Sequence, residues 1–335
     1  LGNKSTIAET RAKALLAMAD RGAATVYINY CGAEQTLRHS GGDKMNWQNL
    51  PSGSRIRKAV KAPKGCKLVV GDSANIEARV LPALAGQHDI VEKYRRGEDL
   101  YCYMATKIFH HEVRKEDPNN PRWKSERFVG KTAVLGLGYG MGAIKFLSTI
   151  KMKEKTATLD FCKAVVNTFR EEYDAVTALW RDCDGFLPFI RDGLRYQIGK
   201  ANVPLYTTKE GIVLPNGLLI RYPNLRQEIG KKGKEWVFDK RKRKVHIYGG
   251  KVVENIVQAL ARIIVMEQAI EISKKWKVMP LLVHDEIVLV VPEEQAEEAA
   301  QDLRRVMKTP PKWWPDLPVS CDVHYGDNYL EAKPA

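Results

Sequence analysis

The chain of 335 residues lacks any continuous apolar run that approaches the roughly 18 to 20 residues needed to span a bilayer. No signal peptide is recognisable at its start. It also contains no internal repeat and no low-complexity tract. The sequence therefore predicts a globular protein without a membrane partner.

Paired cysteines are lacking as well, because the six cysteines are scattered and no two of them form a C-x-x-C pair. Such spacing argues against a zinc site and provides no disulfide framework. We therefore expect reduced thiols in a cytoplasmic setting. The cysteines are Cys31, Cys66, Cys102, Cys162, Cys183 and Cys321.

What the chain has in excess is positive charge. Its formal net charge is +14 and its pI is about 9.4, which favours a polyanionic partner. Nucleic acid, an anionic membrane and ordinary surface chemistry are all compatible with charge alone. A hydrophobic content of 44% over 335 residues suffices for one large domain or two modest ones.

The stretch 67–81 has the pattern of a strand followed by a helix. Residues 68–70 form a short apolar run, and from Asn75 onward apolar residues recur at helical spacing. Asp72 lies between the two elements, where a metal ion or a substrate can reach its carboxylate. The alternative is that Asp72 only caps the helix.

A second stretch, 281–291, contains His284, Asp285 and Glu286 between two apolar runs. This pattern predicts a hairpin of two buried strands with the acidic residues at its turn. Two adjacent carboxylates at the tip of an apolar hairpin are costly unless cations neutralise them. The alternative is an exposed acidic turn that water solvates.

A third stretch, 127–140, contains four residues at intervals of four: Arg127, Lys131, Leu135 and Tyr139. A helix would bring them to one face. Two cations, an apolar side chain and a tyrosine in a row match a triphosphate, a base and a template edge. For this stretch alone, the alternative is a solvated basic face.

Together, the three stretches resemble the motifs of family A DNA polymerases. Residues 72–79 resemble motif A, "DYSQIELR", residues 127–140 resemble motif B, R-x3-K-x7-YG, and residues 284–286 resemble motif C, "HDE". Two more stretches match: 46–51 resembles "NLQNIP", and 248–262 resembles the "GGKLVENIVQAIAR" helix of bacteriophage members. The resemblance covers nearly the whole chain.

The resemblance implies an α+β fold, a right-hand polymerase with an antiparallel palm sheet and mostly helical fingers. We expect a thumb remnant or N-terminal helix over 1–19, palm over 20–90 and 246–335, and fingers over 91–245 with a β-rich insertion near 203–248. The thumb is expected to be largely absent from this chain. A thumb and an exonuclease would then lie on a separate chain or in a missing N-terminal region.

For catalysis, the resemblance implies that Asp72 and Asp285 bridge two Mg²⁺ ions, for which Mn²⁺ can substitute, and that Ser73 adds its backbone carbonyl. Mg²⁺ prefers oxygen ligands, and two ions can stabilise both the attacking and the leaving oxygen of a nucleotidyl transfer. The resemblance makes Glu286 a secondary acid beside this site. It makes His284 a residue that orients the hairpin or the primer end.

For the incoming dNTP, the resemblance implies that Arg127 and Lys131 bind the triphosphate through charge-assisted hydrogen bonds. In the family, the glutamate that matches Glu77 blocks the 2′-hydroxyl of a ribonucleotide. That glutamate also bonds the tyrosine that matches Tyr139. These residues therefore imply a preference for deoxynucleotides.

Two positions of the nucleotide site depart from the family pattern. Tyr101 stands where the family often has His, near the incoming phosphates, so any phosphate role is weakened. Leu135 stands where the family has Phe or Tyr, so the nascent base pair loses an aromatic neighbour. Neither departure removes a metal ligand.

Primer–template DNA is the expected macromolecular partner. The arginine that matches Arg38 lies in the minor groove at the primer end in the family; the alternative for Arg38 is an exposed loop residue. The matching stretches also imply DNA contacts for Gln48, Gln258, Arg262 and His284.

A basic run between residues 231 and 244 brackets Trp236 and Phe238. A charge run is usually a solvated face. With aromatic residues interleaved, contact with the DNA backbone is an equally weighted alternative.

We therefore predict a DNA-directed DNA polymerase of bacteriophage type, in the cytoplasm of a host cell if phage-encoded. One alternative is a catalytically weak, polymerase-like DNA-binding module that needs a partner chain, but both metal aspartates are present. Another is a relative of the single-subunit RNA polymerases, which lack the glutamate matching Glu77 and read "HDS" at motif C. The Tyr-x-Asp-Asp turn of reverse transcriptases does not occur in the sequence.

Overall fold

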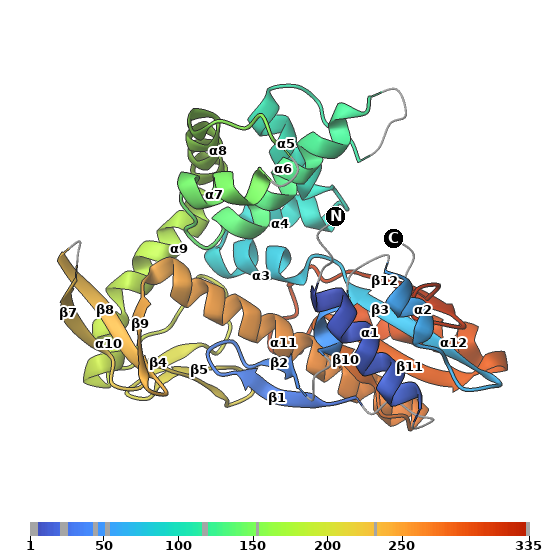
Figure 1. The fold of residues 1–335 in the computed structure, drawn as a ribbon. Coiled ribbons are helices and arrows are strands. Elements are labelled where there is room, and N and C mark those ends of the chain that lie inside the picture. The colour runs from blue at the N-terminus through green and yellow to red at the C-terminus, as the bar shows by residue number, and fades with distance from the viewer. Residues whose placement is uncertain are drawn as a thin grey trace. The chain divides into compact units, whose positions relative to one another are not determined.

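The computed structural model describes residues 6–20, 26–42, 46–50, 54–115, 120–151, 154–230 and 233–332. The chain forms two compact units, whose elements are shown in Figure 1. The first unit contains Leu1–Ala74, Ala261–Thr309 and Val319–Ala335. The second contains Asn75–Leu260 and Pro310–Pro318. Among the described helices, none combines the length and the apolar character that crossing a membrane requires.

The first unit is built on a four-stranded antiparallel sheet in the order β10-β11-β3-β12. Its strand β3 (Cys66–Ser73) pairs with β11 (Glu286–Pro292) on one side and with β12 (Cys321–Gly326) on the other. The strands β10 (Leu281–Val283) and β11 form a hairpin.

Both faces of β3 are buried, which explains why its apolar residues are consecutive rather than alternating. Val69 belongs to a core that includes residues of α12 (Ala296–Met307), the helix that Figure 1 shows beside this sheet. Leu68 and Val70 belong to a second core on the other face, together with Tyr329 near the C-terminus. The two cores hold β3 in the middle of the unit.

The first unit also contains a pair of antiparallel strands and several helices. These elements are α1 (Thr6–Ala19), β1 (Ile28–Ala33), β2 (Arg38–Gly41), η1 (Trp47–Asn49), α2 (Arg55–Ala59) and η2 (Glu293–Gln295).

The first part of the second unit is helical. Its helices are α3 (Ile76–Ala85), α4 (His88–Arg95), α5 (Leu100–Phe109), α6 (Arg122–Leu137), α7 (Ala143–Ile150), α8 (Leu159–Glu172), α9 (Asp174–Gly185) and α10 (Leu187–Asp192). The helices α5 and α6 approach closely because Gly130 has no side chain. A Cβ atom at Gly130 would lie 2.2 Å from the carbonyl oxygen of Tyr101, so any larger residue would push the helices apart.

Two three-stranded antiparallel sheets follow, in the orders β4-β5-β6 and β7-β8-β9. Their strands are β4 (Tyr206–Thr208), β5 (Gly211–Val213), β6 (Leu219–Arg221), β7 (Arg226–Gly230), β8 (Gly233–Lys240) and β9 (Arg243–Ile247). The long helix α11 (Gly249–Trp276) begins in the second unit and continues into the first. A Cβ atom at Gly250 would lie 2.7 Å from the carbonyl oxygen of Tyr139, so glycine lets the start of α11 meet the turn after α6.

The α+β class with an antiparallel sheet is confirmed, as is the predicted hairpin at 281–291. One detail of the predicted helical face is wrong. The helix α6 ends at Leu137, and Gly138 is its C-cap, so Tyr139 lies in the following turn and not on the helix. Glycine lowers helix propensity, which accounts for the early end. The palm and fingers boundaries stay a proposal, and the first compact unit is interrupted at Ala74.

Candidate active site

Strand pairing in the first unit brings together acidic residues that are distant in sequence. Asp72 on β3 lies directly opposite Glu286 on β11, so both side chains point to the same face of the sheet. The carbonyl oxygen of Asp285, in the adjoining turn, accepts a 3.0 Å hydrogen bond from the amide of Ser73. The three predicted acids therefore gather at one end of β3, with Asp72 and Asp285 half-buried.

Asp72 does not cap the helix that follows it. The N-cap of α3 is Asn75, which has a left-handed conformation with a φ of 56° and makes no side-chain capping bond. Asp72 instead lies within β3, where its backbone pairs with β11 on one side and β12 on the other. The capping alternative for Asp72 is therefore wrong.

The hairpin turn is a two-residue loop of His284 and Asp285. His284 has a φ of 53°, a conformation that costs a non-glycine residue free energy and needs support from its surroundings. Gln48 provides this support: its side-chain oxygen accepts a 2.7 Å bond from the His284 amide, and its side-chain nitrogen donates to the carbonyl of Leu282 at 2.8 Å. Because Gln48 is buried, the structure makes it a positioning residue for the turn. Its DNA contact stays a prediction.

The His284 ring contacts the same segment. Its Nε2 lies 3.2 Å from Oδ1 of Asn49. Burial and then the nearby charge of Arg38, at the start of β2, lower the pKa of His284. The ring is therefore neutral at pH 7, which suits an orienting role.

Glu286 is not at the exposed tip that the sequence suggested. The two-residue loop leaves it as the first residue of β11, where it is buried. The hydroxyl of Tyr329 donates a short hydrogen bond to its carboxylate. Burial and the charge of Glu286 raise the pKa of Tyr329, so that hydroxyl stays a donor. The guanidinium of Arg57 lies 4.7 Å from the centre of the Tyr329 ring. The buried Arg57 therefore packs on the residue that bonds Glu286.

A second histidine of the first unit is buried with less complete hydrogen bonding. Nε2 of His39 lies 3.4 Å from the sulfur of Met266, and its Nδ1 has no hydrogen-bond partner among the described residues. Burial, followed by the charges of Arg262 and His284, lowers the pKa of His39 to about 4. His39 is therefore a neutral core residue at pH 7.

The carboxylates of Asp72 and Asp285 offer the oxygen ligands that Mg²⁺ prefers. Within the described ranges, no group of three or more His, Cys, Asp or Glu side chains is arranged to hold a metal ion. Mg²⁺ in nucleotide sites is typically bound by one or two carboxylates together with substrate phosphates and water. The two carboxylates therefore fit a Mg²⁺ ion whose remaining ligands come from the substrate phosphates and water.

In the second unit, α6 positions one of the predicted cations through an ion pair. Arg127 donates two hydrogen bonds, of 2.9 and 2.7 Å, to Oδ2 of Asp99. The other oxygen of Asp99 caps α5 by accepting from the amides of Tyr101 and Cys102. One carboxylate therefore ties the start of α5 to the guanidinium on α6, and the guanidinium is held in a fixed orientation.

The ring of Tyr101 supports both cations of α6. The ring centre is 5.3 Å from the Arg127 guanidinium carbon and 5.7 Å from Nζ of Lys131. Tyr101 is buried, and its hydroxyl donates to Oδ1 of Asn75 at 2.7 Å. Its ring, not its hydroxyl, contacts the two cations, and a phosphate contact stays a prediction. Lys131 itself is exposed.

The predicted bond between Glu77 and Tyr139 is present. The hydroxyl of Tyr139 donates to Oε2 of Glu77 at 3.2 Å. Glu77 lies in the first turn of α3, and Tyr139 lies in the turn that follows α6. Leu135 is on α6 with a 38% exposed side chain, so its surface is open to a base.

Arg38 is the first residue of β2 and is half-buried, not an exposed loop residue, and its DNA contact stays a prediction. Two further predicted DNA contacts lie on α11. Gln258 and Arg262 are both half-buried and one turn apart on this helix. Nε of Arg262 is buried without a hydrogen-bond partner among the described residues. Neither residue's DNA contact is tested by this arrangement, and both stay predictions.

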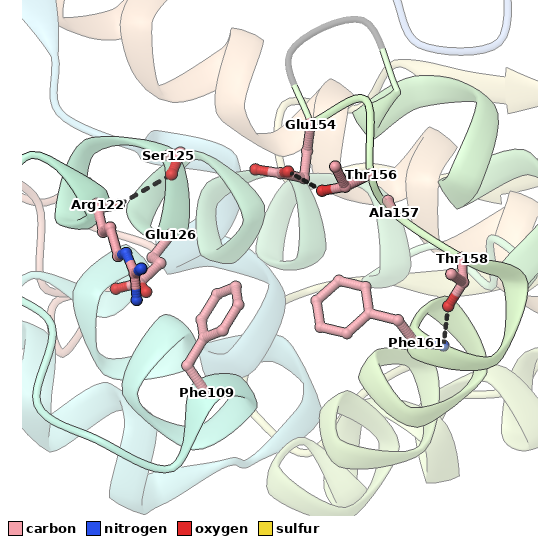
Figure 2. A pocket seen from close by; sticks show the side chains of 9 residues that line it. All are labelled: Phe109, Arg122, Ser125, Glu126, Glu154, Thr156, Ala157, Thr158 and Phe161. Atoms are coloured by element: carbon pink, nitrogen blue, oxygen red, sulfur yellow. Dashed lines mark hydrogen bonds between the residues drawn. The ribbon is translucent and has the colours of Figure 1, made fainter.

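A hollow of about 490 Å³ in the second unit is lined in part by residues of α6, as Figure 2 shows. The rings of Phe109 and Phe161 form its apolar part, with centroids 5.8 Å apart. Arg122 and Glu126 contribute its charged part from α6. Arg122 and Lys131 lie on opposite sides of the helix. The hollow is therefore separate from the face that carries the predicted nucleotide residues.

Sequence analysis missed several residues that support the site. Asp99 had a recognisable signal, because an Asp directly before an apolar helical run is a typical N-cap. Tyr329 had none, since its bond to Glu286 joins residues 43 positions apart. Asp322, which lies opposite Asp72 on β12, had none either, because only strand pairing places it there.

Comparisons with known proteins identify the family of the chain. Residues 4–186, more than half of the chain, match the model of DNA polymerase family A. The chain is 28% identical over 287 residues to the DNA polymerase of Bacillus phage SP02, which covers 82% of this chain and 43% of that protein. It is 27% identical over 311 residues to the thermostable DNA polymerase I of Thermus filiformis, which covers 90% of this chain and 32% of that protein. The chain thus spans less than half the length of these relatives.

A solved structure shares the fold. The POL domain of Pol1 from M. smegmatis, in complex with DNA primer-template and dNTP, matches with a TM-score of 0.66 at 20% identity, over 97% of this chain and 51% of that chain. At this identity the match establishes the architecture of a polymerase domain. The family match over residues 4–186 shows that the chain belongs to DNA polymerase family A.

Proposed function

We propose that this chain catalyses template-directed DNA synthesis, adding deoxynucleotides to the 3′ end of a primer by two-metal-ion nucleotidyl transfer. The observation that carries the proposal is the pairing of β3 with β11. It sets Asp72 opposite Glu286, and the amide of Ser73 bonds the carbonyl of Asp285 in the adjoining turn. This is a cluster of acids at a strand end, with a backbone that two cores hold in place.

Family A polymerases generally use divalent metal ions. We assign Asp72 and Asp285, with the backbone carbonyl of Ser73, as the ligands of two Mg²⁺ ions, for which Mn²⁺ can substitute. When bound, such ions stabilise negative charge on the attacking 3′ oxygen and on the leaving pyrophosphate. Glu286 accepts a hydrogen bond from Tyr329, so we propose that it holds β11 in position beside these ligands.

The triphosphate of the incoming nucleotide is assigned to Arg127 and Lys131. Arg127 is already oriented by Asp99, so little side-chain entropy is lost when it binds a phosphate. Lys131 is exposed, and a compact ammonium on a flexible stem can follow a moving phosphate. Charge-assisted bonds of this kind are about twice as strong as neutral ones.

Selection of deoxyribose is assigned to Glu77. Its carboxylate is held by the hydroxyl of Tyr139, so it is not free to swing away from a nucleotide that carries an extra hydroxyl. A buried or held polar group discriminates better than a mobile one, because the wrong substrate leaves it unpaired or clashes with it. Leu135 supplies an apolar surface for the base.

Primer–template DNA is the proposed macromolecular partner, with contacts from Arg38, Gln258, Arg262, Gln48 and His284. We propose palm over residues 20–90 and 246–335 and fingers over 91–245. A thumb and an exonuclease would belong to a separate chain or an N-terminal region. The net charge of +14 supports a polyanionic partner. The six free thiols support a reducing cytoplasm, that of a host cell if the protein is phage-encoded.

The test is primer extension by the purified chain with Mg²⁺ and a defined template. The expected result is addition of the deoxynucleotide that the template codes for, lost when a chelator removes the metal. Binding of the primer–template without extension would contradict the proposal and favour a DNA-binding module. Faster use of ribonucleotides than of deoxynucleotides would favour an RNA polymerase.

A further inference from the structure

The sheet β7-β8-β9 of the second unit has two faces of different charge. Side chains alternate between the faces of a strand, so the observed register assigns each residue of the sheet to one side. One face carries all the carboxylates of the three strands: Glu228, Glu235 and Asp239. The other face carries no carboxylate; its cations are Lys234, Lys240 and Arg243, and two of its apolar residues, Phe238 and Ile247, are buried in the protein.

The carboxylates of the first face are paired with basic side chains of the same face. Arg226 pairs with Glu228 at 2.9 Å and with Asp239 at 3.1 Å. Lys244 also contacts Glu228, and His246 lies 3.0 Å from Glu235. A hydrogen bond from Asn224 and then one from Arg226 lower the pKa of Asp239, and hydrogen bonds from Lys244 and Arg226 lower the pKa of Glu228. These two carboxylates are therefore paired within the protein.

The opposite face has cations that the protein does not neutralise. Lys234 and Arg243 are exposed, Lys240 is half-buried, and no ion pair is found for these three among the described residues. Lys240 and Arg243 are direct partners across β8 and β9. Like charges directly opposite one another destabilise a sheet, so this arrangement costs free energy unless an anion binds there.

A pocket of about 410 Å³ near the sheet is lined by three more cations, Arg191, Lys209 and Arg221, and by one carboxylate, Glu210. Its lining residue Asn224 bonds Asp239 of the first face. Two contacts join the pocket to the face. The guanidinium of Arg191 lies 5.7 Å from the ring of Trp236, and the ring of Tyr222, which lines the pocket, contacts Phe238 edge-on at 5.2 Å.

The ion pairs at the pocket are weak competitors for an anion. Arg191 pairs with its neighbour Asp192 at 2.6 Å, and Arg221 approaches Glu210 at 3.7 Å. All four side chains are well exposed to solvent, and exposed pairs of this kind contribute little free energy. The cations can therefore exchange these carboxylates for phosphates at little cost.

We infer that this surface, the carboxylate-free face of β7-β8-β9 with its adjoining pocket, binds the phosphate backbone of nucleic acid. The cations lie on β8, on β9 and in the pocket, and a set spread in this way matches a chain of phosphates rather than a single anion. The exposed Ile229 and the half-buried Trp236 provide apolar surface beside the cations, as surfaces that bind nucleic acid commonly do. The inference rests on the proposed function in one respect, because primer–template DNA is the backbone expected there.

The test compares two triple variants of the full chain. One removes the charges of the face, Lys234→Gln, Lys240→Gln and Arg243→Gln. The matched control removes the same charge from exposed lysines elsewhere, Lys64→Gln, Lys274→Gln and Lys312→Gln. We expect Kd for a labelled primer–template at about 0.1 M salt to rise on the order of tenfold in the face variant and to stay within about twofold in the control. The slope of log K against log salt should become less steep by about 2 to 3 in the face variant only.

Two further arms identify the source of the phosphates. A blunt duplex and a single strand are titrated separately. A loss confined to one of them assigns the surface to that form of the backbone. Equal Kd values and salt slopes in the two triple variants would overturn the inference. So would loss of binding to vesicles of anionic lipid while DNA affinity is kept, which would make the surface a membrane contact.

Primer extension on the same preparations separates the two proposals. If the wild-type chain extends primers and the face variant binds DNA as the control does, only this inference fails. If the wild-type chain neither binds nor extends primer–template, the proposed function fails, and this inference fails with it.

Discussion

In the first unit, Asp72 and Glu286 are neighbours because two strands pair, whereas in the second unit Arg127 and Lys131 share one helix. The acids are joined across more than two hundred positions by β3 and β11 and are held between two buried cores. The cations are one turn apart on α6 and are oriented by side chains, Asp99 and Tyr101.

The two sites differ in how far their geometry depends on the rest of the fold. A shift of one residue in the pairing of β3 would turn Asp72 to the opposite face of the sheet, so the geometry of the acids depends on the fold of the whole unit. The cations of α6 keep their spacing wherever the helix forms. We therefore expect changes at the sheet to affect chemistry and stability together, and changes at the helix to affect nucleotide use alone.

The largest expected effect comes from removing a metal carboxylate. Asp72→Ala or Asp285→Ala should lower the rate of nucleotide incorporation on the order of 10³-fold, about 4 kcal/mol of transition-state stabilisation. Affinity for primer–template should change little, because neither residue is assigned a phosphate contact. Asp316→Ala, which removes an exposed carboxylate of the second unit, is the matched control and should cost less than tenfold. Near wild-type extension by either aspartate variant would remove the two-metal assignment.

Lys131→Ala tests the helix side of the comparison. Its loss should lower kcat/KM for dNTP about tenfold to a hundredfold, because a hydrogen bond to a charged group is worth about 1.5–3 kcal/mol. Stability should stay unchanged because Lys131 is exposed. Arg122→Ala, a cation on the opposite side of α6, serves as control and should leave kcat/KM near wild type. A fall in DNA affinity instead would show that this face of α6 contacts DNA.

Glu77→Ala tests sugar selection. Removing the carboxylate opens space for a 2′-hydroxyl and breaks the 3.2 Å bond to Tyr139. The ratio of kcat/KM for dNTP over rNTP should fall about tenfold, since one lost steric or hydrogen-bonding element is worth about 1–3 kcal/mol. Tyr139→Phe, which loses the bond but keeps the carboxylate, should reduce the ratio less. An unchanged ratio in Glu77→Ala would leave Glu77 as an ordinary residue of the first turn of α3.

Tyr329→Phe tests whether the sheet site is coupled to stability. The substitution leaves the buried Glu286 without its hydroxyl donor, which should lower the free energy of unfolding by about 1–3 kcal/mol. Incorporation should slow as well, because β11 loses part of its support. Tyr325→Phe, at an exposed position of β12, should change stability by less than about 0.5 kcal/mol. Equal denaturation curves for the two variants would contradict a contribution of the Tyr329–Glu286 hydrogen bond to stability.

A pH dependence of stability also belongs to the first unit. The pKa of His39 is lowered from 6.5 to about 4 in the folded protein, so the unfolded chain binds the proton more tightly. Stability from the neutral ring is present above pH 6.5 and is lost as the pH falls toward 4. Between pH 7 and pH 5 the loss should be about 2 kcal/mol. His39→Gln should flatten this part of the pH profile, whereas His88→Gln, at an exposed position, should not. An unchanged slope in His39→Gln would contradict a buried neutral ring.

The residues that sequence analysis placed correctly are those fixed by local patterns. The apolar run of β3, the hairpin at 281–291 and the helical spacing of Arg127 and Lys131 each depend on neighbours within one or two turns of chain. Local rules failed at ends and loops: α6 ends before Tyr139, and Glu286 lies in β11 and not in the turn. In both cases the predicted end of an element was wrong by one or two residues, and local sequence preference is weakest at such boundaries.

By itself, the sequence determined the types of element, the motif residues and the positive charge of the chain. Only the tertiary structure decided that Asp72 faces Glu286, that Tyr329 and Gln48 support the hairpin, and that one face of β7-β8-β9 carries no carboxylate. The physical reason is that helical spacing and burial patterns are properties of consecutive residues, whereas strand register and buried hydrogen bonds join distant parts of the chain. Their partners are selected when whole cores pack, and no local pattern records that selection.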